Sequence, residues 1–157
     1  MNIKYFTRTC AILLATLLMS ACEGTKKDVR EPFIGEYTFV STGDVDLYAG
    51  VLKITTIPMN EEGKLSIFAA DEPNQVWMVA GEDTTLGHVK GNELYLDSLN
   101  AQSTYNNLVL NISFTYEKAT LEGNQLSWVT NAKISATYNA LYLSGIGKVN
   151  IVATKVE

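Results

Sequence analysis

Cysteine and histidine are scarce in this chain, and their scarcity excludes several kinds of active site. There are two cysteines, Cys10 and Cys22, and one histidine, His88. A zinc site needs several His or Cys ligands at fixed spacing, which one histidine cannot supply. A serine or cysteine nucleophile needs an adjacent base, and no Gly-x-Ser-x-Gly motif occurs. We therefore expect no zinc site, and we interpret His88 as a structural residue within a strand.

Basic residues are also in short supply, since 12 Lys and Arg face 17 Asp and Glu. The only basic cluster beyond the N-terminal region is Lys26-Lys27. Nucleic-acid binding requires a basic patch for phosphate contacts, so this class of function is excluded. Glycines stand between strand-like segments, not between a strand and a helix as in nucleotide-binding loops. We expect no nucleotide and no other cofactor.

A short apolar run near the N-terminus predicts an export signal. Lys4 and Arg8 lie in a start without acidic residues, and the apolar run from Cys10 to Met19 follows. This layout is typical of a secretory signal. The run has about ten residues, whereas a membrane-spanning helix needs roughly 20. We therefore expect residues 1–21 to be a cleaved leader, and its loss would bring the net charge to −7 because Lys4 and Arg8 leave with it.

The end of this run, Leu17-Leu18-Met19-Ser20-Ala21-Cys22, resembles the lipobox of bacterial lipoproteins, with Met19 where leucine is usual. The resemblance implies cleavage before Cys22 after a lipid is attached to its thiol. An ordinary signal cut after Ala21 would instead leave a free thiol. Because Cys10 belongs to the leader, the exported part can form no internal disulfide, and Cys22 is available for acyl chains that anchor it lastingly. We expect a lipid-anchored protein of the cell envelope, in the outer membrane.

The residues after Cys22 divide into a polar segment and one domain. Glu23 to Pro32 shows no apolar periodicity and is interpreted as a flexible tether, which spans at most ~35 Å when extended. From Phe33 onward the chain is long enough for one domain with its own core. The expected organisation is a leader at 1–21, a lipidated cysteine and tether at 22–32, and a β domain at 33–157.

The domain is expected to be all-β, because apolar and polar residues alternate and helical spacing is absent. In the clearest strand, Leu108–Tyr116, Leu110, Ile112 and Phe114 share one face, while the other face is polar apart from Val109. One dry and one wet face are typical of antiparallel sheets. Further strands are predicted at 36–42, 47–57, 64–69, 75–79, 84–90, 93–98, 117–121, 125–130, 132–143 and 148–155.

Turn residues predict how these strands are connected. Gly91-Asn92 and Gly123-Asn124 tolerate the positive φ of tight hairpins. Longer hairpin loops are predicted at 61–63 and 144–147. Connections this short force antiparallel neighbours. We therefore expect an antiparallel meander β-barrel of about eight strands, with a two-sheet β-sandwich as the alternative.

The start of the domain, Pro32-Phe33-Ile34-Gly35-Glu36-Tyr37-Thr38-Phe39, resembles the Gly-x-Trp first strand of lipocalins, with Tyr37 in the Trp position. Together with the lipobox, the polar tether, the domain size and the closing segment 148–155, it is similar to lipocalin-like or calycin-like lipoproteins of Bacteroidetes. The resemblance implies an eight-stranded barrel whose mouth or interior takes a small ligand. It transfers no catalytic residue.

Acidic residues give no clear catalytic or metal-binding pattern. Asp44-Val45-Asp46 and Glu82-Asp83 offer oxygen ligands without the spacing of a calcium loop, so we interpret both as solvated turns. Glycoside cleavage needs two carboxyl groups at a set separation, and Glu36, Asp97 and Glu117 are expected on wet strand faces. We expect no metal site and no enzymatic activity.

Aromatic residues are the remaining candidates for a binding site. Trp77, Trp128, Tyr138 and Tyr142 are the possible ligand-binding residues, either lining a barrel cavity or stacking on a saccharide, although core packing accounts for them as well. The leading hypothesis is a membrane-anchored binding domain for a small hydrophobic or saccharide ligand. The alternative is a lipoprotein with a filled barrel that contacts another envelope protein. A cavity containing Trp77 or Trp128 favours the first, and a packed interior favours the second.

Overall fold

The computed structural model describes residues 27–105, 107–138 and 140–156, which form strands and turns. The predicted leader at 1–21 and the predicted lipidation site, Cys22, lie outside the described residues. No helix in the described part is long and apolar enough to cross a membrane. The strands are β1 (Gly35–Ala49), β2 (Leu52–Pro58), β3 (Glu61–Ala69), β4 (Gln75–Ala80), β5 (Asp83–Lys90), β6 (Glu93–Leu96), β7 (Leu99–Tyr105), β8 (Leu108–Tyr116), β9 (Ala119–Glu122), β10 (Gln125–Tyr138) and β11 (Leu141–Lys155).

Eight of these strands close into an antiparallel barrel. Around the barrel the order is β1, β3, β4, β5, β6, β9, β10 and β11, and β11 pairs with β1 to complete the circle. Each strand pairs antiparallel with the next. The prediction of an all-β barrel of about eight strands is confirmed, and the sandwich alternative is not the fold.

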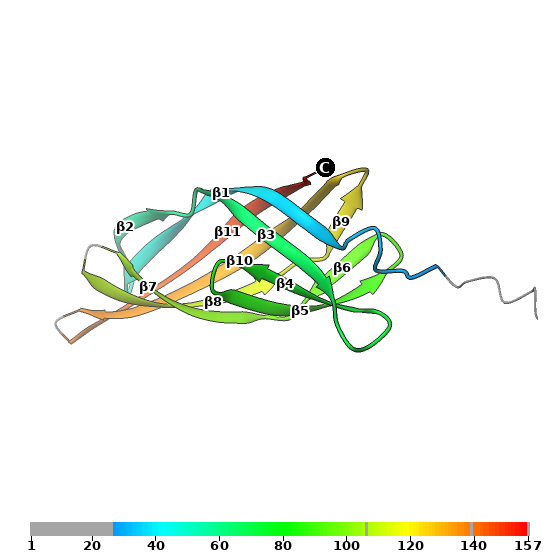
Figure 1. The fold of residues 1–157 in the computed structure, drawn as a ribbon. Helices are drawn as coiled ribbons and strands as arrows, with labels where there is room; N and C mark the ends of the chain where they lie inside the picture. The colour runs from blue at the N-terminus through cyan, green and yellow to red at the C-terminus, as the bar shows by residue number, and fades with distance from the viewer. Residues whose placement is uncertain (1–26, 106, 139, 157) are drawn as a thin grey trace, which may run out of the picture.

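The other three strands extend the barrel at one end. β1, β10 and β11 are long, and their outer halves continue as a six-stranded sheet in the order β2-β1-β11-β10-β8-β7. Figure 1 shows β10 and β11 running the length of the molecule, with β2, β7 and β8 at one end and β6 and β9 at the other. The meander is therefore interrupted twice, by β2 and by the β7–β8 hairpin. The sequence pattern did not reveal β7, because its side chains are mostly polar or small and partly exposed.

Two apolar clusters form the core, one in each half of the molecule. The cluster inside the barrel includes Phe33, Tyr37 and Leu94. The cluster on the inner face of the six-stranded sheet includes Leu47, Leu110 and Ile134. Both belong to the segment from Lys27 to Glu157, which we call the β domain. Because this segment carries every described strand and both clusters, it contains what it needs to fold on its own.

The tight hairpins are where the sequence predicts them, but two other predicted segments differ. Gly91 joins β5 to β6 and Gly123 joins β9 to β10, with φ near +64° and +63°. The strand predicted at 47–57 is interrupted by a turn at Gly50, whose φ is also positive. The strand predicted at 132–143 is two strands, since β10 and β11 meet as neighbours at Tyr138 and Leu141. Apolar alternation continues through both turns, so periodicity alone could not locate them.

The loop predicted at 144–147 is strand interior, and that predicted at 61–63 is the start of β3, since residues 59–60 connect β2 to β3. Gly145 and Gly147 lie in β11 and face inward against β1. A Cβ added to Gly145 would lie 2.5 Å from the carbonyl oxygen of Asp46. A Cβ added to Gly147 would overlap the carbonyl oxygen of Asp44. These glycines allow two long strands to approach closely and do not make a turn.

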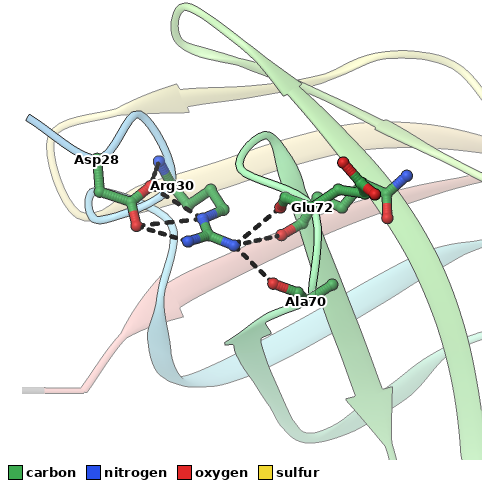
Figure 2. A network of polar contacts seen from close by, with 5 residues as sticks. Asp28, Arg30, Ala70 and Glu72 are labelled. Carbon is green, nitrogen blue, oxygen red and sulfur yellow. Dashed lines mark hydrogen bonds and ion pairs between the residues drawn. The ribbon is translucent and has the colours of Figure 1, made fainter. Parts of the chain in front are cut away.

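The N-terminal segment is attached to the β3–β4 loop through Arg30. Figure 2 shows the Arg30 guanidinium between the Asp28 carboxylate and three backbone carbonyls, of which that of Gln75 is the most distant at 3.4 Å. It donates to Asp28 at 2.8 Å, to the carbonyl of Ala70 at 2.7 Å and to that of Glu72 at 2.9 Å. The pKa of Asp28 falls to about 2, because its carboxylate accepts hydrogen bonds from the side chain and the backbone N–H of Arg30. The chain is therefore held from Asp28 onward, five residues before the predicted start of the domain.

The same segment closes one end of the barrel. Phe33 and Tyr37 are fully buried, and the Tyr37 hydroxyl donates to the carbonyl of Phe33 at 2.7 Å. The Lys155 ammonium lies 6.0 Å from the centre of the Tyr37 ring and donates to the carbonyl of Pro32 at 3.1 Å. Lys155 of β11 therefore contacts both β1 and the N-terminal segment at this end of the barrel.

Candidate ligand cavity

The inner face of β10 carries the central side chains of the candidate site. Alternation along this strand turns Leu126, Trp128, Thr130 and Ala132 inward, and all four are buried. The strand leaves the barrel and enters the six-stranded sheet between Ser127, which pairs with β9, and Thr130, which pairs with β8. Trp128 and Thr130 therefore lie where the two halves of the molecule meet.

A cavity of about 390 Å³ lies at this junction, between the two apolar clusters. This volume is near the lower end of the ~300–1,000 Å³ typical of small-molecule sites. Its walls combine barrel residues such as Leu65 and Met78 with sheet residues such as Ile57, Leu110 and Ile112. The cavity thus offers a mainly apolar space suited to a small ligand.

Four polar side chains in the cavity wall are buried, and they fall into two pairs. Ser41 donates to the carbonyl of Met59 at 2.8 Å, and Thr85 donates to that of Asp97 at 2.9 Å. The indole Nε1 of Trp128 and the Oγ1 of Thr130 find no hydrogen-bond partner among the described residues. Trp128 is 6% exposed and Thr130 2%. A buried polar atom without a partner costs free energy, so this pair needs an explanation.

Tyr116 adds a third polar group beside this pair. It is directly opposite Thr130 in the β8–β10 pairing, so the two side chains share the inner face. Burial raises the pKa of Tyr116 to about 12, with a smaller contribution from the Asp83 carboxylate. The phenol is therefore neutral at physiological pH and keeps its proton to donate. We call Tyr116, Trp128 and Thr130 the polar cluster.

The charge around the cavity has one sign. Glu61 and Asp83 are the only charged side chains among its described lining residues, and both are exposed, at the ends of β3 and β5. No Lys, Arg or His takes part in the described lining. The electrostatic environment therefore disfavours a bound anion.

The four aromatic residues singled out from the sequence do not come together. Trp128 lines the cavity, whereas Trp77 is on the outer face of β4, 42% exposed and paired with Phe68 of β3. Tyr138 and Tyr142 are exposed near the connection between β10 and β11. Sequence reasoning missed Thr130 and Tyr116. The alternation that turns Trp128 inward also points to Thr130, but the position of Tyr116 depends on strand register.

Tyr142 instead borders an open groove on the outer face of the six-stranded sheet. This groove encloses about 910 Å³ and is lined by Tyr48, Lys133 and several Asn, Gln and Ser side chains. Within it, Gln102 of β7 donates to its paired neighbour Asn111 of β8 at 2.8 Å. None of the described groove residues contributes a buried polar atom without a partner. The groove therefore carries a weaker indication of a ligand than the cavity.

The acidic candidates are scattered. Asp46 lies within β1, not in a loop, and pairs with Lys53 at 2.7 Å, which lowers the pKa of its carboxyl. Glu36 accepts a hydrogen bond from Ser66, and Glu117 pairs with Lys148 at 3.4 Å. Within the described ranges, no group of three or more His, Cys, Asp or Glu side chains is placed to hold a metal ion. His88 is half-buried on β5, opposite Gln75 and Tyr95.

In comparisons with known proteins, no family model matches this chain and no curated protein matches it.

Proposed function

We propose that this chain is a lipid-anchored protein of the bacterial cell envelope, in the outer membrane, whose barrel holds a small and mainly apolar ligand. The observation that carries the proposal is the apolar cavity with two buried polar atoms, Trp128 Nε1 and Thr130 Oγ1, that have no partner among the described residues. A ligand in the cavity would satisfy both atoms and cover the surrounding apolar side chains. The proposed role is binding without catalysis.

The anchor in this proposal comes from the sequence. The lipobox-like segment ending at Cys22 supports attachment to a membrane, and the N-terminal segment leaves the barrel at its closed end. Asp28 is six residues after Cys22, a length of chain that spans at most ~22 Å. The domain would therefore be held close to the membrane. In this proposal the outer faces are the part of the domain that an envelope protein partner would contact.

The alternative, a filled barrel that acts only through its outer surface, is less well supported. It requires side chains to occupy the interior, whereas the described residues leave about 390 Å³ between the two clusters. It also gives no reason for the position of Thr130, because a valine would pack there without burying a hydroxyl.

Binding of Nile red, a neutral apolar dye, to the β domain tests the proposal. We expect one dye per chain, with increased fluorescence. Leu110→Phe and Val149→Phe fill the cavity from two different strands and should each weaken binding at least about tenfold, since both side chains lie in its wall. Val109→Phe is the control, because this neighbour of Leu110 is 55% exposed on the outer face.

The variants are compared only where circular dichroism shows an intact β domain. Because the two cavity-filling substitutions are on different strands, the test can still be made if one of the variants does not fold. Unchanged dye affinity in a folded Leu110→Phe or Val149→Phe variant would show that the dye binds elsewhere, and would overturn the proposal.

A further inference from the structure

The chemistry of the cavity wall specifies the kind of ligand beyond its being apolar. The indole Nε1 of Trp128 can only donate a hydrogen bond, whereas the Thr130 hydroxyl can donate or accept. The atom that satisfies Trp128 must therefore be an acceptor. The ligand needs at least one oxygen or nitrogen with a free lone pair.

One polar group of the ligand can serve both side chains. Trp128 and Thr130 are two residues apart on one strand, which separates their Cα atoms by about 7 Å. Tyr116 is opposite Thr130 and keeps its phenolic proton. A single hydroxyl or carbonyl oxygen has two lone pairs and can accept from two of these donors. The polar cluster thus fits one small head group.

The rest of the wall excludes both a strongly polar and an anionic ligand. Ser41 and Thr85 already bond to the backbone, so the buried wall has few groups left for the many hydroxyls of a saccharide. A carboxylate would enter a cavity whose charged lining residues are Glu61 and Asp83, with no cation among the described ones. An unpaired buried charge is costly, and two like charges nearby add to the cost.

We propose that the cavity selects a neutral, mainly apolar molecule with one hydrogen-bond-accepting head group, such as an aliphatic alcohol or ketone, and discriminates against the carboxylate of the same chain length. This selectivity rests on the proposed function, because it assumes that the cavity is the binding site. The head group lies at Trp128 and Thr130, and the chain contacts Leu110, Ile112 and Met78.

Trp128 can report on this site directly. The chain has two tryptophans, so Trp77→Phe leaves Trp128 as the sole fluorophore of this kind. Hexanol, hexane and hexanoate are then titrated at neutral pH while its emission is followed. Hexanol should bind about 3- to 10-fold more tightly than hexane, the contribution of one hydrogen bond. Hexanoate should bind at least about tenfold more weakly than hexanol.

Affinities measured for variants and at different pH values test the selectivity separately from ligand binding itself. In the Trp77→Phe background, Thr130→Val should weaken hexanol about 3- to 10-fold and leave hexane unchanged. Thr137→Val is the control, since it makes the same change on the exposed outer face of β10. The affinity for hexanoate should rise as the pH falls below 5, when its carboxyl becomes neutral, while that for hexanol stays constant.

The outcomes are distinct. If none of the three compounds changes the emission of Trp128, the proposed function itself fails. If all three bind but hexane equals hexanol, or hexanoate equals or exceeds it, the cavity still binds ligands and only the selectivity is overturned. Equal losses in Thr130→Val and Thr137→Val would also contradict it, because the head group would then not contact Thr130.

Discussion

Trp128 and Thr130 lie two residues apart on the same face of β10, and each buries a polar side-chain atom that has no hydrogen-bond partner among the described residues. Ser41 and Thr85, in the same cavity wall, both donate to backbone carbonyls. Ser41 and Thr85 thus stabilise the barrel through hydrogen bonds of their own. In the function proposed above, Trp128 and Thr130 are the pair that bonds to a ligand.

Paired threonine substitutions should show this difference as opposite effects on stability. Thr130→Val removes an unpaired buried hydroxyl at nearly constant volume, so the free energy of unfolding is expected to stay level or rise by up to about 2 kcal/mol. Thr85→Val removes the donor to the Asp97 carbonyl and should lower it by about 1–2 kcal/mol. Urea unfolding of the ligand-free β domain measures both. Equal destabilisation would mean that Thr130 has a partner in the folded protein.

Tyr116 should make stability depend on pH in the alkaline range. Its pKa is about 12 in the folded protein and near 10 in the unfolded chain, so the folded state holds the proton more firmly between these values. Stability is thus fully present below pH 10 and decreases as the pH rises toward 12. The free energy of unfolding should fall by about 1–2 kcal/mol, because solvent screening of the partly exposed Tyr116 phenol reduces the effect of its pKa shift on stability.

Urea unfolding at pH 9 and pH 11 of the β domain and of Tyr116→Phe checks this dependence. The substitution should reduce the alkaline loss without removing it, since burial also raises the pKa of Tyr37. An identical pH dependence in the two proteins would show that the Tyr116 phenol is not buried as described.

Arg30 should control how firmly the N-terminal segment is attached. Arg30→Lys keeps the charge but loses the planar group that contacts Asp28 and three backbone carbonyls together. Backbone amides of Phe33 and Gln75 should then exchange hydrogen faster, because their bonds lie in the joined segments. Lys53→Ala, which breaks a separate surface pair with Asp46, is the control.

Low pH should loosen the same contact. The folded pKa of Asp28 is below its ordinary value of 3.8, so the contribution of this carboxylate is present above pH 4 and is lost as the pH falls toward 2. The protection of the Phe33 amide, meaning how much more slowly it exchanges than in an unstructured chain at the same pH, should fall over this range in the native sequence and change little in Asp28→Asn. An equal loss of protection in both proteins would contradict the attachment through Asp28.

Cys22 should decide whether the full-length protein stays with the membrane. In cells that express the full chain, Cys22→Ser removes the thiol that would carry the lipid. After cell fractionation, we expect the native protein in the membrane fraction and the Cys22→Ser variant in the soluble fraction. Cys10→Ser makes the same change within the expected leader and should have no effect. Mass spectrometry of the native protein should find acyl chains on Cys22. An unmodified thiol on a protein found in the periplasm would disprove the anchor.

The sequence predicts the barrel well because its evidence is local. Alternation and the turns at Gly91 and Gly123 are properties of short segments, and the structure confirms both. The loop predicted at 144–147 is wrong because the local sequence around Gly145 and Gly147 does not show which role these glycines have. Glycine suits a turn or a close approach of two strands equally, and only the pairing of β11 with β1 distinguishes the two.

The site is less predictable because it depends on pairing across the barrel. Trp128 is a candidate from its residue type, but nothing local places Tyr116 opposite Thr130. Nor can the sequence tell that Thr85 donates to a carbonyl while Thr130 has no partner in the part of the chain that the structure describes. These facts depend on strand register, which brings residues far apart in the chain into one wall.

A crystal structure of the β domain with hexanol bound tests the central claim most directly. We expect the hydroxyl oxygen within hydrogen-bond distance of Trp128 Nε1, about 2.7–3.2 Å, with the chain among Leu110, Ile112 and Met78. Hexanol found only in the outer groove beside Tyr142, or a cavity closed by its own side chains, would contradict the account.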